Sequence, residues 1–412
     1  MTPSTARLPN MNANRIGQAL RRFRLAQPMS QRELAAVLFC DRSYITSVEK
    51  GRRWPGNRGW VEEADLALDA GGELVAAWDA DQAERAEAAD TMRLLEDARR
   101  GSEQLLLAPD GASLDEIEQR IVDIATKARL ESYDLTLERA LGLRAELTRR
   151  LQVGAYSPNA IRDLYVALGR VCGVLAYLTL DLGQADHAKV HAQAAFQLGE
   201  RAGHDQLRAW SRGTQALAHR FTKDFELAAA AAEDGLTYVG KSTGTTEPRL
   251  LCGLAASVAN LGQSERALEL LKQADRARAQ GANSDEIAGL FTFTPAKQVY
   301  YHGFSLMWAD DLKTLNRSIK ASEEALQAWR VQRSPGDEML TTIYLAMANA
   351  RVGDLDASLA AVSPVLEQPI EHHFSWVRKR LNQLDGLLAQ HFPGSREAEE
   401  ERQTLRAYVH AA

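Results

Sequence analysis

The stretch that most constrains the fold is residues 30–53, where two short helical patterns follow one another closely. Ser30 can cap the first helix, and Glu33, three residues later, would complete a capping box. Asp41 can cap the second helix, and Gly51 would end it. The side chains that would then face inward are Leu34, Val37 and Leu38 from the first helix and Ile45 and Val48 from the second. The segment therefore predicts two packed helices joined by a tight turn.

The exposed face of the second helix is polar and carries a positive charge. With Ile45 and Val48 inward, Arg, Ser, Tyr and Thr side chains are left to form hydrogen bonds on the other side. Residues 1–60 hold 11 Lys and Arg against 3 Asp and Glu, a net charge of +8, whereas the remainder carries −14 and the whole chain −6. Basic charge concentrated on such a helix pair is typical of a protein that binds a polyanion.

This stretch resembles the helix-turn-helix of the phage-repressor (XRE-type) family. The family pattern SQxELAxxLGxSrsxISxIExGrRxP compares with SQRELAAVLFCDRSYITSVEKGRRWP here, and the resemblance extends from Arg15 to near Trp78. Phe39 departs from the pattern, because the family has a helix-ending glycine at this place. We therefore expect Phe39 to adopt a left-handed backbone conformation, which is strained for a residue other than glycine.

The resemblance implies that the second motif helix enters the major groove of double-stranded DNA. It assigns base contacts to Arg42, Ser43, Tyr44 and Ser47, with Thr46 beside them. Arg42 would bind guanine through two hydrogen bonds. It assigns phosphate contacts to Gln31, Lys50, Arg52 and Arg53. The alternative is that this N-terminal domain, which we call the head, binds protein rather than DNA. In that case Arg42→Ala and Arg53→Ala would leave retention on DNA unchanged.

The sequence around this motif predicts several segments. Residues 1–13 would be a disordered tail and residues 14–79 a five-helix domain, with further helices at Arg15–Ala26, Trp60–Leu68 and Glu73–Trp78. In the first helix, Ile16, Leu20 and Phe23 would face inward and Arg21, Arg22 and Arg24 outward. Residues 80–112 would be a helical linker ended by Pro109-Asp110-Gly111, residues 113–392 a repeat domain and residues 393–412 a C-terminal tail.

Small residues recur in the second part of the chain at offsets that suit packed helical hairpins. They occur at Ala176, Ala216, Ala255 and Ala346, 12 positions later at Ala188, Ala228, Ala267 and Ser358, and 7 further on at Ala195, Gly235, Ala274 and Val365. Turn signals fall between the first two series, and a degenerate copy begins at Gly303. Two antiparallel helices approach closely only where side chains are small.

This signature resembles the tetratricopeptide repeat, although the copies recur every 39 to 48 residues, further apart than in that family. The sequence therefore predicts an all-α fold, with a repressor-like domain followed by an α-solenoid. The arrangement is similar to helix-turn-helix/tetratricopeptide regulators of high-GC Gram-positive bacteria and to peptide-sensing quorum regulators.

In this repeat register, cationic and aromatic residues would line the concave side at Tyr177, Arg220, Arg249, Asn260, Lys297, Tyr300, Phe304 and Trp308. They suit a ligand with a carboxylate and apolar parts; the other interpretation is core packing.

Other motifs favour ordinary structural roles. The P-loop string from Gly235 to Ser242 lacks the preceding strand that phosphate binding requires, so we interpret it as a coincidence. An NTPase would instead lose ATP turnover on Lys241→Ala. His187 and His191 share a helix face without a third metal ligand and are expected to be a solvated pair. His372-His373 is a weaker metal candidate still.

The localisation expected from the sequence is the cytoplasm. The three cysteines, Cys40, Cys172 and Cys252, are widely spaced and form neither a disulfide framework nor a metal-ligand pair. The N-terminal residues lack a signal-peptide core, and the longest near-apolar run, Val171–Leu180, is too short to span a membrane.

Together these patterns predict a sequence-specific DNA-binding transcriptional regulator that is not an enzyme and uses no cofactor or metal. We expect a homodimer on a palindromic operator, with a small-molecule or peptide effector bound to the repeat domain. The alternative is a tetratricopeptide scaffold whose head binds protein.

Overall fold

The computed structural model describes residues 14–27, 29–104, 115–128, 131, 133–153, 158–239, 244–280, 285–332, 334–368 and 375–410. Within these ranges there are 19 α-helices, one short 3-10 helix and no strand, which confirms the all-α prediction. The predicted tail 1–13, the turn Pro109-Asp110-Gly111 and His372-His373 lie outside the described residues. The chain divides into two compact units, which we call the N-terminal unit (Leu8–Leu94) and the body (Leu95–Ala412).

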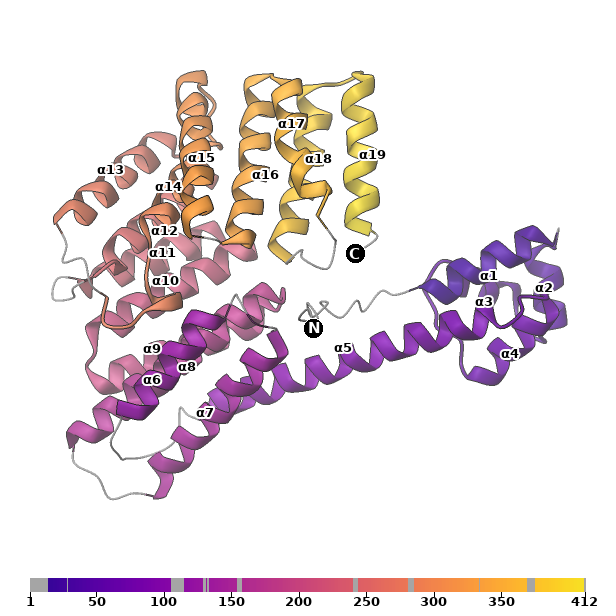
Figure 1. Ribbon diagram of the computed structural model, residues 1–412, viewed down its shortest axis with the longest axis horizontal. Helices are drawn as coiled ribbons and strands as arrows, with labels where there is room; N and C mark the ends of the chain where they lie inside the picture. Colours follow the sequence, from indigo (N-terminus) through magenta and orange to yellow (C-terminus); the bar gives the residue numbers. More distant parts are fainter. Residues whose placement is uncertain are drawn as a thin grey trace. The chain divides into compact units, whose positions relative to one another are not determined.

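The N-terminal unit contains four short helices and the first part of a long one (Figure 1). They are α1 (Arg15–Ala26), α2 (Gln31–Val37), α3 (Arg42–Glu49), α4 (Arg58–Ala67) and α5 (Glu73–Gln104). The core contains predicted inward positions, namely Ile16, Leu20, Leu34, Leu38, Ile45 and Val48. Val61, Leu68 and Leu74, which were not among the predicted inward positions, extend it. Val37, predicted to face inward, is 49% exposed, because α2 ends there and its last turn lies at the surface.

Helix α5 is one continuous helix where the sequence predicted a short helix ending at Trp78 and a separate linker. Between Trp78 and Gln104 the sequence is rich in Ala, Glu and Arg and contains no proline, so nothing interrupts the helix. Its first part is fixed to the N-terminal unit, since the Asp81 carboxylate accepts a hydrogen bond from the Ile16 backbone N–H at 3.0 Å. Each of the two units contains part of α5.

The body is a succession of helical hairpins (Figure 1). It begins with α6 (Asp115–Lys127) and α7 (Tyr133–Val153). The hairpins that follow are α8–α9 (Pro158–Asp181, Ala185–Ala202), α10–α11 (Asp205–Phe221, Phe225–Leu236), α12–α13 (Thr246–Asn260, Ser264–Gln280), α14–α15 (Pro295–Leu306, Leu312–Gln332), α16–α17 (Pro335–Val352, Leu355–Leu366) and α18–α19 (Ser375–His391, Arg396–His410). The first helix of each hairpin contacts the first helix of the next, which confirms the predicted solenoid.

The predicted small residues lie where helices approach most closely. Ala176, Ala216, Ala255 and Ala346 are all buried. In the degenerate copy, a Cβ on Gly303 would come within 2.4 Å of the Ser322 Oγ atom, so α14 and α15 could not approach as they do. Gly235 has a similar packing role against Leu250, as predicted, while residues 240–242 of the P-loop string lie outside the described residues.

Two elements of the body differ from the sequence prediction or extend it. The predicted C-terminal tail is wrong for Arg396–His410, which form α19 and bury Ala398 and Leu405 against neighbouring helices. Helix α8 is long and apolar enough by composition to cross a membrane, but 83% of its apolar window is buried inside the protein. A buried apolar helix of this length is the core helix that the first hairpin requires.

The prediction that His187 and His191 are a solvated pair is wrong for His191. Its side chain is fully buried on α9, and its Nδ1 atom lies 2.5 Å from the Ser102 Oγ atom on α5. The Arg144 guanidinium donates to the Ala98 carbonyl one turn before Ser102. Burial, together with the nearby positive charge of Arg144, lowers the pKa of His191 to about 3. The histidine is therefore neutral near neutral pH and joins α9 to the end of α5.

Replacing His191 with asparagine should remove one component of acid sensitivity. The pKa of His191 in the folded protein, about 3, lies below its ordinary value of 6.5. The unfolded state therefore binds one more proton between these values, and the free energy of unfolding falls by about 1.4 kcal/mol per pH unit as the pH drops below 6.5. The contribution is fully present above pH 6.5 and is lost towards pH 3. Urea titrations at several pH values should show this extra slope in the wild type alone; equal slopes would contradict a buried neutral His191.

Candidate nucleic-acid interface

Helix α2 begins with the predicted capping box. The Ser30 Oγ atom accepts a hydrogen bond from the Glu33 backbone N–H at 3.2 Å, and the Glu33 carboxylate accepts one from the Ser30 N–H at 2.7 Å. These bonds hold the pKa of Glu33 below its ordinary value, because they favour the charged carboxylate. At the other end of α2, Phe39 has the predicted left-handed conformation, with φ of 49°, and its side chain is 95% exposed.

Helix α3 is fixed by its buried face. Ile45 and Val48 are fully buried, as predicted, and α1 approaches so closely that a Cβ on Gly17 would lie 2.2 Å from the Val48 carbonyl oxygen. Asp41 occupies the predicted N-cap position, but the prediction of a side-chain cap is wrong, since its carboxylate makes no cap hydrogen bond. Gly51 follows the helix with φ of 67°, the conformation that its predicted helix-ending role requires.

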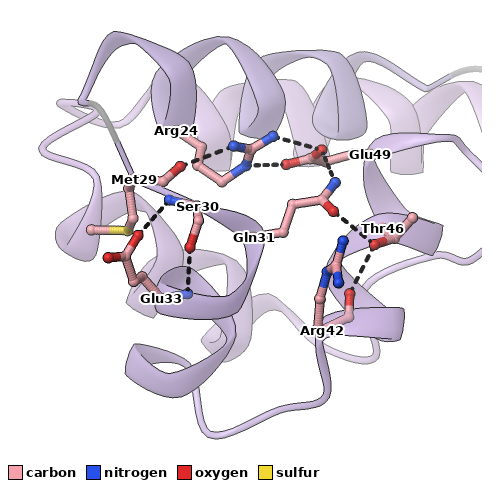
Figure 2. A network of polar contacts seen from close by, with 8 residues as sticks. All are labelled: Arg24, Met29, Ser30, Gln31, Glu33, Arg42, Thr46 and Glu49. Carbon is pink, nitrogen blue, oxygen red and sulfur yellow. Dashed lines mark hydrogen bonds and ion pairs between the residues drawn. The ribbon is translucent and has the colours of Figure 1, made fainter.

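A buried polar network joins α1, α2 and α3 (Figure 2). Arg24 was predicted to face outward, which is wrong: it is 7% exposed and donates to both carboxylate oxygens of Glu49, at 2.6 and 3.0 Å. Its remaining contact is the Met29 carbonyl at 2.9 Å, just before α2. The Gln31 amide donates to Glu49 at 2.7 Å and accepts from the Thr46 hydroxyl at 3.0 Å. The middle of α3 and its C-terminal end are therefore tied to the helix pair behind it.

The network places two of the predicted DNA-contacting residues inside the unit. Gln31 and Thr46 are partly buried, and their polar groups bond to each other. The Thr46 hydroxyl also donates to the Arg42 carbonyl at 3.0 Å, and the Ser47 hydroxyl donates to the Ser43 carbonyl at 2.7 Å. Arg42 and Ser43, at the start of α3, are exposed.

Tyr44 packs against the segment that follows α3. Its hydroxyl accepts a hydrogen bond from the Gly56 N–H at 2.9 Å, and its ring meets the Trp60 ring edge-on at 5.4 Å. The Arg53 guanidinium lies 4.9 Å from the Tyr44 ring centroid. Tyr44 therefore holds the turn between α3 and α4 and places Arg53 beside α3, while its side chain stays partly exposed.

Most of the exposed positive charges that have no acidic partner among the described residues of the unit lie around α3. Arg15, Arg22, Arg24 and Arg58 all form ion pairs with carboxylates. Six exposed cations of the unit form no ion pair with any described residue: Arg21 and Arg32, and the four that the sequence assigned to DNA, Arg42, Lys50, Arg52 and Arg53. Four of these six unpaired positive charges thus lie at the two ends of α3.

The predicted ligand residues of the body fall into separate groups. Arg249 donates to the Tyr177 hydroxyl at 2.9 Å, and Arg220 lies beside the same small cavity, whose volume is about 10 Å³. Tyr300 and Phe304 are buried in an aromatic cluster with Tyr344. The others are Lys297, which pairs with Asp337, Asn260, which donates to its own helix at the Ala256 carbonyl, and Trp308, which packs on the core.

Sequence reasoning missed the partners that complete both sites. Glu49 looks like an ordinary surface glutamate near the end of a helix, and only its tertiary contact with Arg24 shows why it is buried. In the body, the missed residue is Tyr301, whose hydroxyl accepts from Arg220 at 3.2 Å. It adjoins Tyr300 in a stretch rich in aromatic residues, from Phe291 to Trp308, and the composition of that stretch was the available signal.

Comparison with known proteins supports the assignment of the motif. Residues 15–78 match the family described as "Helix-turn-helix domain". No curated protein matches the chain. Among solved structures, the chain is similar to Bacillus thuringiensis PlcR in complex with the peptide PapR7 and DNA, with a TM-score of 0.38 and 9% identity, over 91% of this chain and 99% of that one. That similarity is too distant to transfer a function.

Replacing Phe39 with glycine should stabilise the protein. The left-handed conformation costs a residue with a Cβ roughly 1–2 kcal/mol, and the added flexibility of glycine in the unfolded chain offsets roughly 0.5–1 kcal/mol of that gain. Because the side chain is 95% exposed, little packing is lost. We expect the free energy of unfolding to rise by about 0.5–1 kcal/mol in urea titration. Val37→Gly, exposed but helical, is the control and should lower it; destabilisation by Phe39→Gly would contradict the strain.

Removing the Glu49 carboxylate should be among the most damaging changes in the N-terminal unit. Glu49→Ala leaves the Arg24 guanidinium buried without a counter-charge, which typically costs about 3–5 kcal/mol. The double variant Arg24→Met/Glu49→Leu removes both charges and should recover most of that loss. Glu62→Ala, which breaks the exposed pair with Arg58, is the control and should cost less than about 1 kcal/mol. Equal losses for Glu49→Ala and Glu62→Ala in denaturant titrations would show that the buried pair is unimportant.

Proposed function

We propose that the protein is a sequence-specific DNA-binding transcriptional regulator. The observation that carries this proposal is the arrangement around α3, where a helix with a fixed buried face presents exposed polar groups and is flanked by four cations without acidic partners. Four exposed cations without acidic partners among the described residues, at the two ends of one helix, favour a polyanionic partner. The helix-turn-helix match over residues 15–78 supports the same partner.

In the proposed complex, α3 lies in the major groove of double-stranded DNA. Arg42 and Ser43, exposed at the start of the helix, contact base edges, and Arg42 donates two hydrogen bonds to a guanine. Lys50, Arg52 and Arg53 bind phosphates and set the register. Two protomers would bind a palindromic operator as a homodimer, because two heads related by a two-fold axis read two half-sites.

The body is the proposed regulatory part. Its hairpins are separate from the DNA-contacting helices in the division of the chain, and α5 contributes to both units. A small molecule or peptide bound by the body would change the affinity for the operator if it bound differently to the free and DNA-bound forms. The buried arginines, Arg220 and Arg249, are the features of the body that favour such a ligand.

Two variants separate base contacts from phosphate contacts. Arg42→Ala should weaken binding to the selected operator by about 1–3 kcal/mol, roughly 5- to 150-fold, and relax the sequence preference at one position. Arg52→Ala should weaken binding to all sequences alike and reduce the slope of log K against log salt by about 1. The measurement is fluorescence anisotropy with an operator selected from a random DNA pool.

The control is Arg22→Ala, which removes an equal charge from an exposed arginine of the same unit that is paired with Glu73. It should leave operator affinity nearly unchanged. If the pool yields no preferred sequence, or if Arg42→Ala and Arg22→Ala retain equal affinity with little salt dependence, the head binds protein rather than DNA.

A further inference from the structure

Two arginines of the body are buried without a counter-charge. Arg220 on α10 is 6% exposed and Arg249 on α12 is 8% exposed. Neither forms an ion pair with any acidic side chain in the part of the chain that the structure describes. This is unusual, because burying an isolated charge is costly unless a charged partner compensates it.

The acceptors that these arginines do have are neutral. Arg220 donates to the Gly253 carbonyl at 3.0 Å and to the Tyr301 hydroxyl at 3.2 Å. Arg249 donates to the Trp210 carbonyl at 2.7 Å and to the hydroxyls of Thr214 and Tyr177, each at 2.9 Å. These bonds orient the guanidinium groups but leave their positive charges uncompensated. Each group also retains N–H donors that have no acceptor among the described residues.

Both guanidinium groups lie beside one small cavity. Its volume is about 10 Å³, the space of one water-sized group, and its lining comes from α8, α10, α11, α12 and α14. Tyr177 and Leu217, which also line it, are partly exposed to solvent. A group that enters the cavity can therefore belong to a larger molecule outside it.

Glycines make room for the two charged groups. A Cβ on Gly213 would lie 2.7 Å from the Arg249 Nη1 atom, and a Cβ on Gly253 would lie 3.1 Å from the Arg220 Nη1 atom. An ordinary side chain at either position would push the guanidinium away. The glycines of α10 and α12 thus leave room for both guanidinium groups along the lining of the same cavity.

We propose that this cavity is the carboxylate-binding subsite of the ligand that the body senses; the proposal rests on the sensor part of the proposed function. One carboxylate oxygen would occupy the water-sized space and accept hydrogen bonds from Arg220 and Arg249. The Tyr301 hydroxyl, which already accepts from Arg220, would donate its proton to the same oxygen. Apolar parts of the ligand would lie outward, beside Tyr177.

The tyrosine has the protonation state that this role requires. Tyr301 is buried, and burial raises its pKa, although the nearby Arg220 and Arg249 charges oppose the rise. It therefore remains a neutral hydroxyl that can act as a donor.

Thermal unfolding of the full chain tests the subsite with sodium acetate as the probe, at an ionic strength held constant with sodium isethionate. Acetate should raise the Tm by about 2 °C or more near saturation, because a ligand that binds only the folded state stabilises it. Acetamide, its neutral analogue, should have no such effect. Arg220→Met/Arg249→Met should abolish the response and, without acetate, should be at least as stable as the wild type, since two uncompensated charges are gone.

The matched control is Arg266→Met, which removes a half-exposed arginine paired with Glu233 on the outer helices and should keep the acetate response. Equal responses to acetate and acetamide in the wild type would overturn the proposal without any variant, even if the double variant failed to fold. Equal acetate responses in the wild type and the double variant would also overturn it. Chloride or phosphate acting as strongly as acetate would overturn the assignment to a carboxylate. DNA binding does not enter these measurements, so their failure is distinguishable from failure of the DNA-binding proposal.

Discussion

The buried ion pair between Arg24 and Glu49 determines how the N-terminal unit presents α3. Hydrophobic contacts through Ile45 and Val48 are enough to hold the helix against the core, but apolar contacts are not directional. The bidentate ion pair between Arg24 and Glu49 fixes the angle and position of the end of α3, because both donors and both acceptors must be aligned. Gln31 extends the same constraint to α2. The geometry that DNA recognition would need is therefore set by a polar contact inside the unit.

In the body, the helices are positioned by the close approach of their backbones rather than by a buried ion pair. Small residues recur at the hairpin contacts, and each hairpin packs mainly on its neighbours. Such a stack can tolerate a larger spacing between copies, as the degenerate copy at Gly303 shows, provided that the contact residue stays small. It also brings side chains from several hairpins to one cavity, which is how Arg220 and Arg249 come to line the same space.

The sequence predicted those features that depend on local chemistry. The capping box at Ser30, the left-handed Phe39 and the small contact positions of the hairpins all follow from rules about neighbouring residues, and the structure contains them. The failures share a different cause. Arg24 and His191 have the periodicity of surface residues and are buried because a partner distant in sequence satisfies them. For the site, the exposed cations were found from charge and motif. Glu49, which positions Arg24, gave no local signal of its role, and Tyr301 was marked only by the aromatic residues around it.

The hydroxyl bonds within α3 have a consequence for how much one head can read. The Ser47 hydroxyl directs its proton to the Ser43 carbonyl, and the single Thr46 proton is shared between the Arg42 carbonyl and the Gln31 amide oxygen. These two side chains therefore have only lone pairs left for a base edge. Discrimination by a single copy of the helix would then rest on Arg42 and a small number of acceptor groups, which amounts to few base pairs of information. A genome contains many other sites that match so few base pairs. These sites would compete with the target for a single head. Selectivity would have to come from the joint occupancy of several half-sites, which makes the spacing between heads as informative as the bases themselves.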